Sequence, residues 1–221
     1  MTSRLDQFFR LITRFAVLNL NWLAGIVVGL LVFGFIPATV TMFKISRRWI
    51  REDADFPLTK TFWTNYKKAF VKSNSYGLLV IFTGLILYMN YLVMMQPGAE
   101  MPLIVVVSYI ALVMFYMIFS AVMIPVSIHF EGRPTVLVKK AVMYMFGKPH
   151  FALLLLLLTW GIAHVSLVVP TLILFFSGSV GSYLIMWLFI RSLDSLQNES
   201  RTDNAEQIRS KLSISNRRIT T

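Results

Sequence analysis

The side chains that commonly perform chemistry in proteins are few in this 221-residue chain and lie far apart. Its three histidines, His129, His150 and His164, lack the spacing of a motif such as H-E-x-x-H, in which two histidines on one helix face bind zinc. No cysteine is present, which excludes disulfides, thiolate metal ligands and thiol nucleophiles. We therefore predict no metal ligand, no cofactor and no catalytic residue.

The acidic residues do not supply a catalytic pair. Asp53 and Asp55 are close in sequence, but they lie in a solvated turn among arginines. Glu131 is the one acid in residues 129–149, and no G-x-S-x-G motif or phosphate-binding loop occurs. Since neither a carboxylate pair nor an activated nucleophile can be identified, we expect that the protein is not an enzyme.

Polar side chains within the apolar parts of the chain are the next candidates. Asn19 and Asn21 are two positions apart, so they point to different faces of a helix. They line a polar path in one interpretation and form hydrogen bonds between helices in the other. No Asp, Glu, Lys or Arg lies within the predicted spans away from their ends, where coupled carriers place an ionisable group.

Two pairs of small residues have the four-residue spacing that lets helix backbones approach closely. They are Gly25 with Gly29 and Ser177 with Gly181. We predict helix packing at both pairs, either against a partner membrane protein or against another helix of the same chain.

The elements that must position these residues follow from four stretches without Asp, Glu, Lys or Arg: 15–43, 73–99, 101–130 and 149–190. A helix crosses the hydrocarbon core with about 20 apolar residues, so the last stretch is long enough to cross twice. We predict an all-α polytopic membrane protein with about five transmembrane helices. The predicted spans are 16–36, 74–95, 102–128, 150–168 and 170–191.

These spans form one membrane domain, 1–192, followed by a polar cytoplasmic tail, 193–221. The connections 38–72 and 129–149 are rich in Lys and Arg, which places both in the cytoplasm. Five spans then put the N-terminus outside. The alternative keeps the N-terminus inside and makes residues 16–36 a re-entrant hairpin around three glycines, Gly25, Gly29 and Gly34.

The two halves of the predicted membrane domain also look alike. Ile36-Pro37-Ala38-Thr39 recurs in outline as Ile124-Pro125-Val126-Ser127, and residues 69–79 align with 145–153. One interpretation is two parallel helix-pair repeats plus a terminal helix. The other is chance similarity, since Lys and aromatic residues commonly flank membrane spans.

The chain carries a formal net charge of +11, and its basic residues lie mostly at the ends of apolar stretches. Anionic headgroups account for that position, and no nucleic-acid-binding motif accompanies it. We expect the basic, aromatic segments to lie on anionic inner-leaflet lipid or to dock a partner protein. The residues predicted for this role are Arg47, Arg48, Trp49, Arg51, Phe62, Trp63, Tyr66, Lys67 and Lys68.

An ordered set of short motifs carries a family resemblance. They are Phe8-Phe9-Arg10, Leu18-Asn19-Leu20-Asn21-Trp22, Ile36-Pro37-Ala38-Thr39, Arg48-Trp49-Ile50-Arg51-Glu52, Thr61-Phe62-Trp63, Tyr66-Lys67, Phe70 and Asn74. In this order they resemble the YesL-like family of bacterial membrane proteins, and the resemblance covers roughly residues 1–192.

The resemblance implies a bacterial cytoplasmic membrane protein from a family of unknown function that is often encoded beside carbohydrate ABC importers. It brings no catalytic residue. We therefore expect a non-enzymatic accessory protein in carbohydrate (oligosaccharide) uptake, in contact with the permease subunits of an ABC importer. The alternatives are a small transporter or channel, as a homo-oligomer in one version, and a membrane-bound regulatory or sensing protein.

Overall fold

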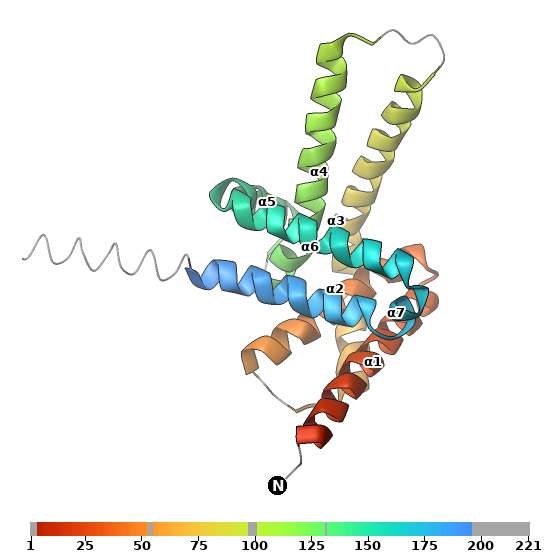
Figure 1. Cartoon of the computed structure of the whole chain (residues 1–221), viewed down its shortest axis with the longest axis vertical. Helices are drawn as coiled ribbons and strands as arrows, with labels where there is room; N and C mark the ends of the chain where they lie inside the picture. Colours follow the sequence, from red (N-terminus) through yellow and green to blue (C-terminus); the bar gives the residue numbers. More distant parts are fainter. Residues whose placement is uncertain (1–3, 53–54, 97–100, 131, 196–221) are drawn as a thin grey trace, which may run out of the picture.

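The computed structural model describes residues 4–52, 55–96, 101–130 and 132–195. All regular structure in this part is helical (Figure 1), which confirms the predicted all-α class. A last helix covers residues 177–195, so most of the predicted tail lies outside the described residues. The other helices are α1 Arg4–Val28, α2 Val32–Glu52, α3 Leu58–Met94, α4 Leu103–His129, α5 Pro134–Gly147, α6 Pro149–Val168 and α7 Pro170–Phe175.

Four of the described helices are long and apolar enough to cross a membrane, so the chain is a multi-pass membrane protein. Two of them reproduce predicted spans closely, namely α4 and α6. The other two differ, because the apolar part of α1 is only one half of a hairpin and α3 extends well before the predicted start at residue 74. The four candidate spans are Phe8–Val28, Leu58–Met94, Leu103–His129 and Pro149–Val168.

The prediction of one straight span over residues 16–36 is wrong. The chain reverses between α1 and α2, where Leu30 and Leu31 adopt positive φ angles of 58° and 62°. Such left-handed residues are strained unless their surroundings hold them. Gly29 and Gly34 allow this, because their backbones touch and leave no room for a β-carbon on either. The reversal is the one that the re-entrant alternative predicted.

The reversal brings the beginning of α1 beside the end of α2. Arg14 forms an ion pair with Asp55 at 2.7 Å, and the ring of Phe15 lies edge-on to Trp49 with centroids 5.5 Å apart. The N-terminal part of α1 is therefore on the same side of the molecule as the basic end of α2. We call this side the open end of the α1–α2 hairpin.

Helix α3 is longer than predicted. Its 37 residues form one helix about 55 Å long, from the basic segment through the predicted second span. At the similar position in the second half of the chain, Pro149 starts α6 directly after Lys148. Proline lacks the N–H that would continue α5, whereas Ser73 leaves α3 unbroken.

The predicted fifth span, 170–191, is not one helix. It is divided at Phe176 into α7 and the helix 177–195. The described residues thus hold four uninterrupted candidate spans and one segment that is helical on both sides of a break.

Most helices pack into one body with two groups of buried side chains. One group joins the end of α4 to α5, α6 and helix 177–195, with further residues from α2 and α3, and includes Leu155 and Phe189. The other joins α1, α2 and the first half of α3 and includes Leu18 and Phe62. We call this part the packed body.

The rest of α3 and α4 extends away from the packed body (Figure 1). We call residues 78–94 of α3 and 103–118 of α4 the outer arms. Their apolar side chains are largely exposed, as with Phe82 at 61% and Leu103 at 78%. Two tyrosines join the arms, because Tyr109 donates to the carbonyl of Leu87 at 2.8 Å and Tyr116 to that of Val80 at 3.0 Å.

Candidate functional site

The residues predicted for docking do not form one surface. Phe62 and Tyr66 face inward, with 0% and 4% of their surface exposed, and Tyr66 donates to the carbonyl of Gly25 at 2.9 Å. They are one helical turn apart, so they share the face of α3 that packs on the α1–α2 hairpin. The prediction that these two aromatic residues dock a partner is therefore wrong.

The other predicted docking residues lie nearer the surface. Trp49 and Trp63 are half-buried, and the ring of Trp63 packs edge-on against Tyr66. Lys67 and Lys68 are exposed on the outer side of α3. Neither lysine lines the cavity that the arginines of α2 form, which is described next.

The three predicted arginines of α2 lie around one polar cavity of about 480 Å³ at the open end of the hairpin. Arg47 and Arg48 lie four and three positions before Arg51, and residues at these spacings share one helix face, which explains why the side chains converge. Neighbouring helices complete the wall. The lining consists of Lys44, Arg47, Arg48, Arg51, Glu52, Asn65 and Ile128.

Specific contacts orient the guanidinium groups of the cavity. Arg51 pairs with Asp194 of helix 177–195 at 2.9 Å, and Arg48 pairs with Glu52 at 2.9 Å within α2. Arg47 donates to the backbone carbonyl of Ile128 in α4 at 3.2 Å. Each arginine has five N–H donors, so these contacts leave further donors for a ligand.

A cation–π contact adds a fourth constraint, because the guanidinium of Arg48 lies 4.3 Å from the ring centre of Phe56. The cavity lining holds four basic residues against one acid, Glu52. Asn65 adds a neutral amide with both donors and an acceptor. Asn65 and Ile128 were not predicted here, since only the tertiary fold brings α3 and α4 to this face of α2. Lys44 was also not predicted, although it lies on α2 one helical turn before Arg47 and Arg48.

Asn19 performs a structural task that its position in the sequence does not reveal. Its side chain is fully buried, and its amide nitrogen donates to the carbonyls of Ile173 and Leu174 at 2.7 and 2.8 Å. Its oxygen accepts from the backbone N–H of Ser179 at 3.1 Å. One side chain thus binds backbone groups on both sides of the break at Phe176, which lack a partner in a helix.

Asn21 points elsewhere, as its spacing from Asn19 predicts. Its amide nitrogen donates to the carbonyl of Val17 at 2.8 Å and to the hydroxyl of Thr59 at 3.3 Å. Both asparagines therefore form internal hydrogen bonds, and the structure does not bring them together along one path.

Asn74 has a similar role that the sequence analysis missed. Pro37 has no N–H to donate to the carbonyl of Phe33, four residues earlier in α2. The side chain of Asn74 donates to that carbonyl at 3.1 Å. A proline inside a predicted apolar helix was the available signal that a polar residue elsewhere must bond the freed carbonyl.

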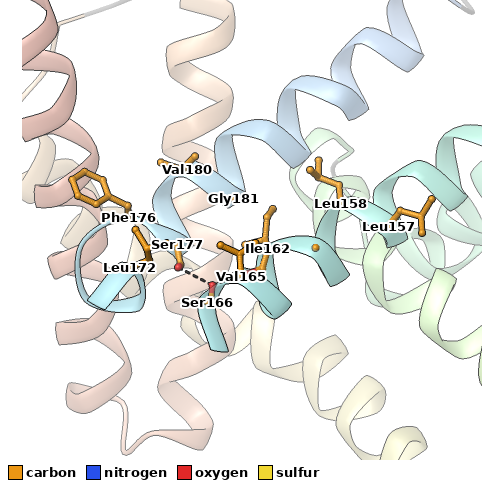
Figure 2. A pocket seen from close by; sticks show the side chains of 11 residues that line it. Leu157, Leu158, Ile162, Val165, Ser166, Leu172, Phe176, Ser177, Val180 and Gly181 are labelled. Carbon is orange, nitrogen blue, oxygen red and sulfur yellow. Dashed lines mark hydrogen bonds between the residues drawn. The ribbon is translucent and has the colours of Figure 1, made fainter. Parts of the chain in front are cut away.

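The small-residue pairs pack within this chain. A β-carbon on Gly25 would lie 3.2 Å from that of Ala38, and one on Gly181 would lie 3.1 Å from the side chain of Ile162. Ser166 donates to Ser177 at 2.7 Å. Figure 2 shows this bond, with helix 177–195 lying along α6.

The same two helices line an apolar groove of about 530 Å³ (Figure 2). Leu157, Val165 and Val180 contribute to its wall, and the two bonded serines supply its polar side chains. This groove suits an acyl chain better than a polar ligand.

No group of three or more His, Cys, Asp or Glu side chains that could hold a metal occurs in the described residues. His129 packs against Phe130 and Phe189, and His164 stacks on Trp160. Asp55 pairs with Arg14, while Asp53 and Glu131 lie outside the described residues. The site with the most developed polar geometry is therefore the cavity of the α2 arginines.

Comparison with known proteins adds relatives for nearly the whole chain. The chain is 31% identical over 187 residues to "Uncharacterized protein YteU" of Bacillus subtilis (strain 168), covering 83% of this chain and 82% of YteU. It is 27% identical over 206 residues to "Uncharacterized protein YesL" of the same organism, covering 93% of this chain and 97% of YesL. The family model "Protein of unknown function, DUF624" matches residues 15–91, which include the reversal between α1 and α2. No solved structure matches the chain significantly.

Proposed function

The chain belongs to the YesL-like family, DUF624, and from this premise we propose that it is a non-enzymatic accessory membrane protein of a carbohydrate ABC importer. The importer is what the family resemblance described above implies. The structural observation that carries the proposal is the pair of outer arms, whose apolar surface the described residues leave largely uncovered.

Asn90 favours a helical partner for these arms over lipid alone. It is exposed on α3, and its amide nitrogen donates to the carbonyl of Ile86 in the same helix at 2.9 Å. Within the part of the chain that the structure describes, nothing donates to its side-chain oxygen. In an apolar environment such an oxygen is stabilised by a donor on a neighbouring membrane helix. We assign this neighbour to a permease subunit.

The polar side chains of the packed body weigh against the alternative of a small transporter. Asn19, Asn21 and Asn74 bond backbone or hydroxyl groups inside the protein. A polar path through the chain would require them to leave backbone carbonyls without a donor, which is unfavourable away from water.

We place the protein in the bacterial cytoplasmic membrane with the open end of the hairpin in the cytoplasm. The arginines of α2 lie at that end, and positive residues favour the cytoplasmic side. Arg14 and Asp194 are bonded there to Asp55 and Arg51, so we place the beginning of α1 and the end of helix 177–195 on the same side. This orientation replaces the external N-terminus that five simple spans predicted.

Site-specific photo-crosslinking in native membranes tests the accessory role. A photoreactive residue at Phe82, on an outer arm, is expected to link the tagged chain to an importer permease subunit. The matched control is Leu155, which has 0% exposure in the packed body and is expected to link only within the chain. Crosslinks from Phe82 to copies of this chain alone would contradict the accessory role and favour a homo-oligomeric transporter.

A further inference from the structure

We propose that the cavity of the α2 arginines is a binding site for a phosphate group, either the headgroup of an anionic phospholipid or a soluble phosphate. The inference does not rest on the importer, because it concerns only residues of this chain. The sequence alone predicts only a general attraction between the basic segments and anionic lipid. The proposal here names one cavity and the chemical group that it binds.

The first argument is charge. Four basic side chains share a cavity of about 480 Å³ with one carboxylate, that of Glu52. Asp194 offsets a second charge through its ion pair with Arg51. Among the described residues Arg47 forms no ion pair, and its hydrogen bond goes to a neutral carbonyl. A bound anion would reduce the repulsion between the like charges that line the cavity.

The second argument is orientation. Three different contacts hold the three guanidinium groups before any ligand arrives: the carbonyl of Ile128 for Arg47, the Phe56 ring for Arg48 and Asp194 for Arg51. A planar guanidinium donates two parallel hydrogen bonds to a phosphate, which a lysine ammonium cannot do. Less side-chain freedom is then lost on binding, so the site is partly preorganised.

The third argument is position. The cavity lies where α2 and α4 end at the open side of the hairpin, and Ile128 provides an apolar edge. A phospholipid there would place its phosphate among the arginines while its acyl chains remain along the apolar helices. The volume also admits a soluble phosphate, since it lies within the usual range of ligand sites, about 300–1,000 Å³.

The test measures phosphate-dependent binding to the full chain purified in detergent. Phosphatidylglycerol is titrated and bound lipid is counted by native mass spectrometry, with diacylglycerol as the probe that lacks phosphate. Inorganic phosphate is tested at matched ionic strength, as a competitor of the lipid and through the midpoint of thermal unfolding. We expect one tightly bound phosphatidylglycerol and no comparable binding of diacylglycerol.

Arg47→Gln removes one charge and one set of forked donors, so it should weaken phosphatidylglycerol binding by about tenfold or more. The matched control is Arg10→Gln, which removes the same charge from an exposed position on α1 away from the cavity lining. Arg47 also contacts α4, so a second variant is needed in case that one misfolds. The second variant is Arg48→Gln. The ion pair of Arg48 joins two residues of α2 and no other helix, and this variant should weaken phosphatidylglycerol binding to a similar extent.

The outcomes separate the two sources of phosphate. If inorganic phosphate displaces the lipid and raises the unfolding midpoint, the site accepts a soluble phosphate. If only the lipid binds, and Arg47→Gln or Arg48→Gln weakens it, the ligand is a phospholipid headgroup. The proposal is overturned if neither probe binds, or if Arg10→Gln weakens lipid binding as much as the cavity variants do.

Discussion

The packed body and the outer arms are both strongly apolar, yet the polar groups of their backbones are hydrogen-bonded in different ways. In the outer arms α3 and α4 are regular helices, and each forms its own backbone hydrogen bonds. In the packed body the chain reverses at residues 29–31, contains Pro37 and breaks at Phe176. Irregular backbone at membrane depth is tolerated only where protein or water bonds its polar groups.

The packed body meets this requirement with side chains from distant parts of the sequence. Asn19 bonds the two sides of the break at Phe176, and Asn74 bonds the carbonyl that Pro37 frees. The outer arms are regular helices, so their backbone groups do not depend on side chains in this way. Two tyrosine hydroxyls of α4 donate to carbonyls of α3 and join the arms. The difference indicates that the body is built to hold one conformation, while the arms offer surface to lipid or to a partner.

The largest expected effect is at the reversal between α1 and α2. In Gly29→Ala the new β-carbon would meet the backbone of Gly34 and the hydroxyl of Tyr66, so the two helices must separate. We expect a loss of about 3–5 kcal/mol in the free energy of unfolding, or failure to accumulate in the membrane. The measurement is the unfolding midpoint in detergent together with the yield of monodisperse protein.

The same substitution at Gly161 is the control for Gly29→Ala. No atom lies within 4 Å of a β-carbon placed there, and alanine suits a helix interior better than glycine. Gly161→Ala should leave stability unchanged or raise it slightly. Equal losses at both positions would show that the close contact at Gly29 does not hold the hairpin.

The break at Phe176 should be the next most sensitive feature. Asn19→Leu removes a side chain that makes three hydrogen bonds to backbone groups and leaves those groups without that partner. We expect a loss of roughly 2–4 kcal/mol. Asn90→Leu on an outer arm is the matched control, since its amide bonds only its own helix, and it should change stability little.

Hydrogen exchange offers a more local test of the same bond. In Asn19→Leu the amide of Ser179, which donates to Asn19, should exchange faster than in the unmodified protein. Unchanged exchange at Ser179 together with unchanged stability would contradict the role given to Asn19.

The pair of Pro37 and Asn74 gives a smaller effect with an internal check. Asn74→Leu leaves the carbonyl of Phe33 without its donor and should lower stability by about 1–3 kcal/mol. Pro37→Ala restores an N–H that can bond this carbonyl within α2. In a double-mutant cycle the loss from Asn74→Leu should therefore be smaller in the Pro37→Ala background, and additive effects would contradict the pairing.

The comparison also explains which parts of the fold were predictable. The spans 102–128 and 150–168 agree closely with Leu103–His129 and Pro149–Val168, because charged residues or a proline bound those apolar stretches. The reversal at 29–31 lies within an uninterrupted apolar run, and hydropathy does not detect a change of direction there. Gly25, Gly29 and Gly34 were the signal, and they supported the alternative that was not preferred.

The candidate site was predictable to a similar extent. The arginines of α2 were found because basic and aromatic residues concentrate in the connection 38–72. Phe62 and Tyr66 were misassigned, because an aromatic residue beside lysines suits an interface and a core equally well from sequence alone. Asn65 and Ile128 could not be assigned to the cavity, because α3 and α4 reach α2 only in the folded chain.

The smallest expected effect on stability is in the outer arms. A substitution there should leave the free energy of unfolding almost unchanged, in contrast to one in the packed body. Phe82→Ala removes a side chain that is 61% exposed, so the purified protein should lose no more than about 0.5 kcal/mol in detergent. Leu155→Ala, in the packed body, should lose about 2–5 kcal/mol, because it leaves a cavity in a filled core.

The order of these two variants should reverse when binding to importer subunits is measured in place of the free energy of unfolding. If the outer arms bind permease helices, Phe82→Ala lowers the recovery of importer subunits by affinity capture although the protein itself remains stable. Leu155→Ala should lower recovery only in proportion to the folded protein that remains. If Phe82→Ala destabilises the isolated protein as much as Leu155→Ala does, the arms pack within this chain, and they cannot be the surface that a partner covers.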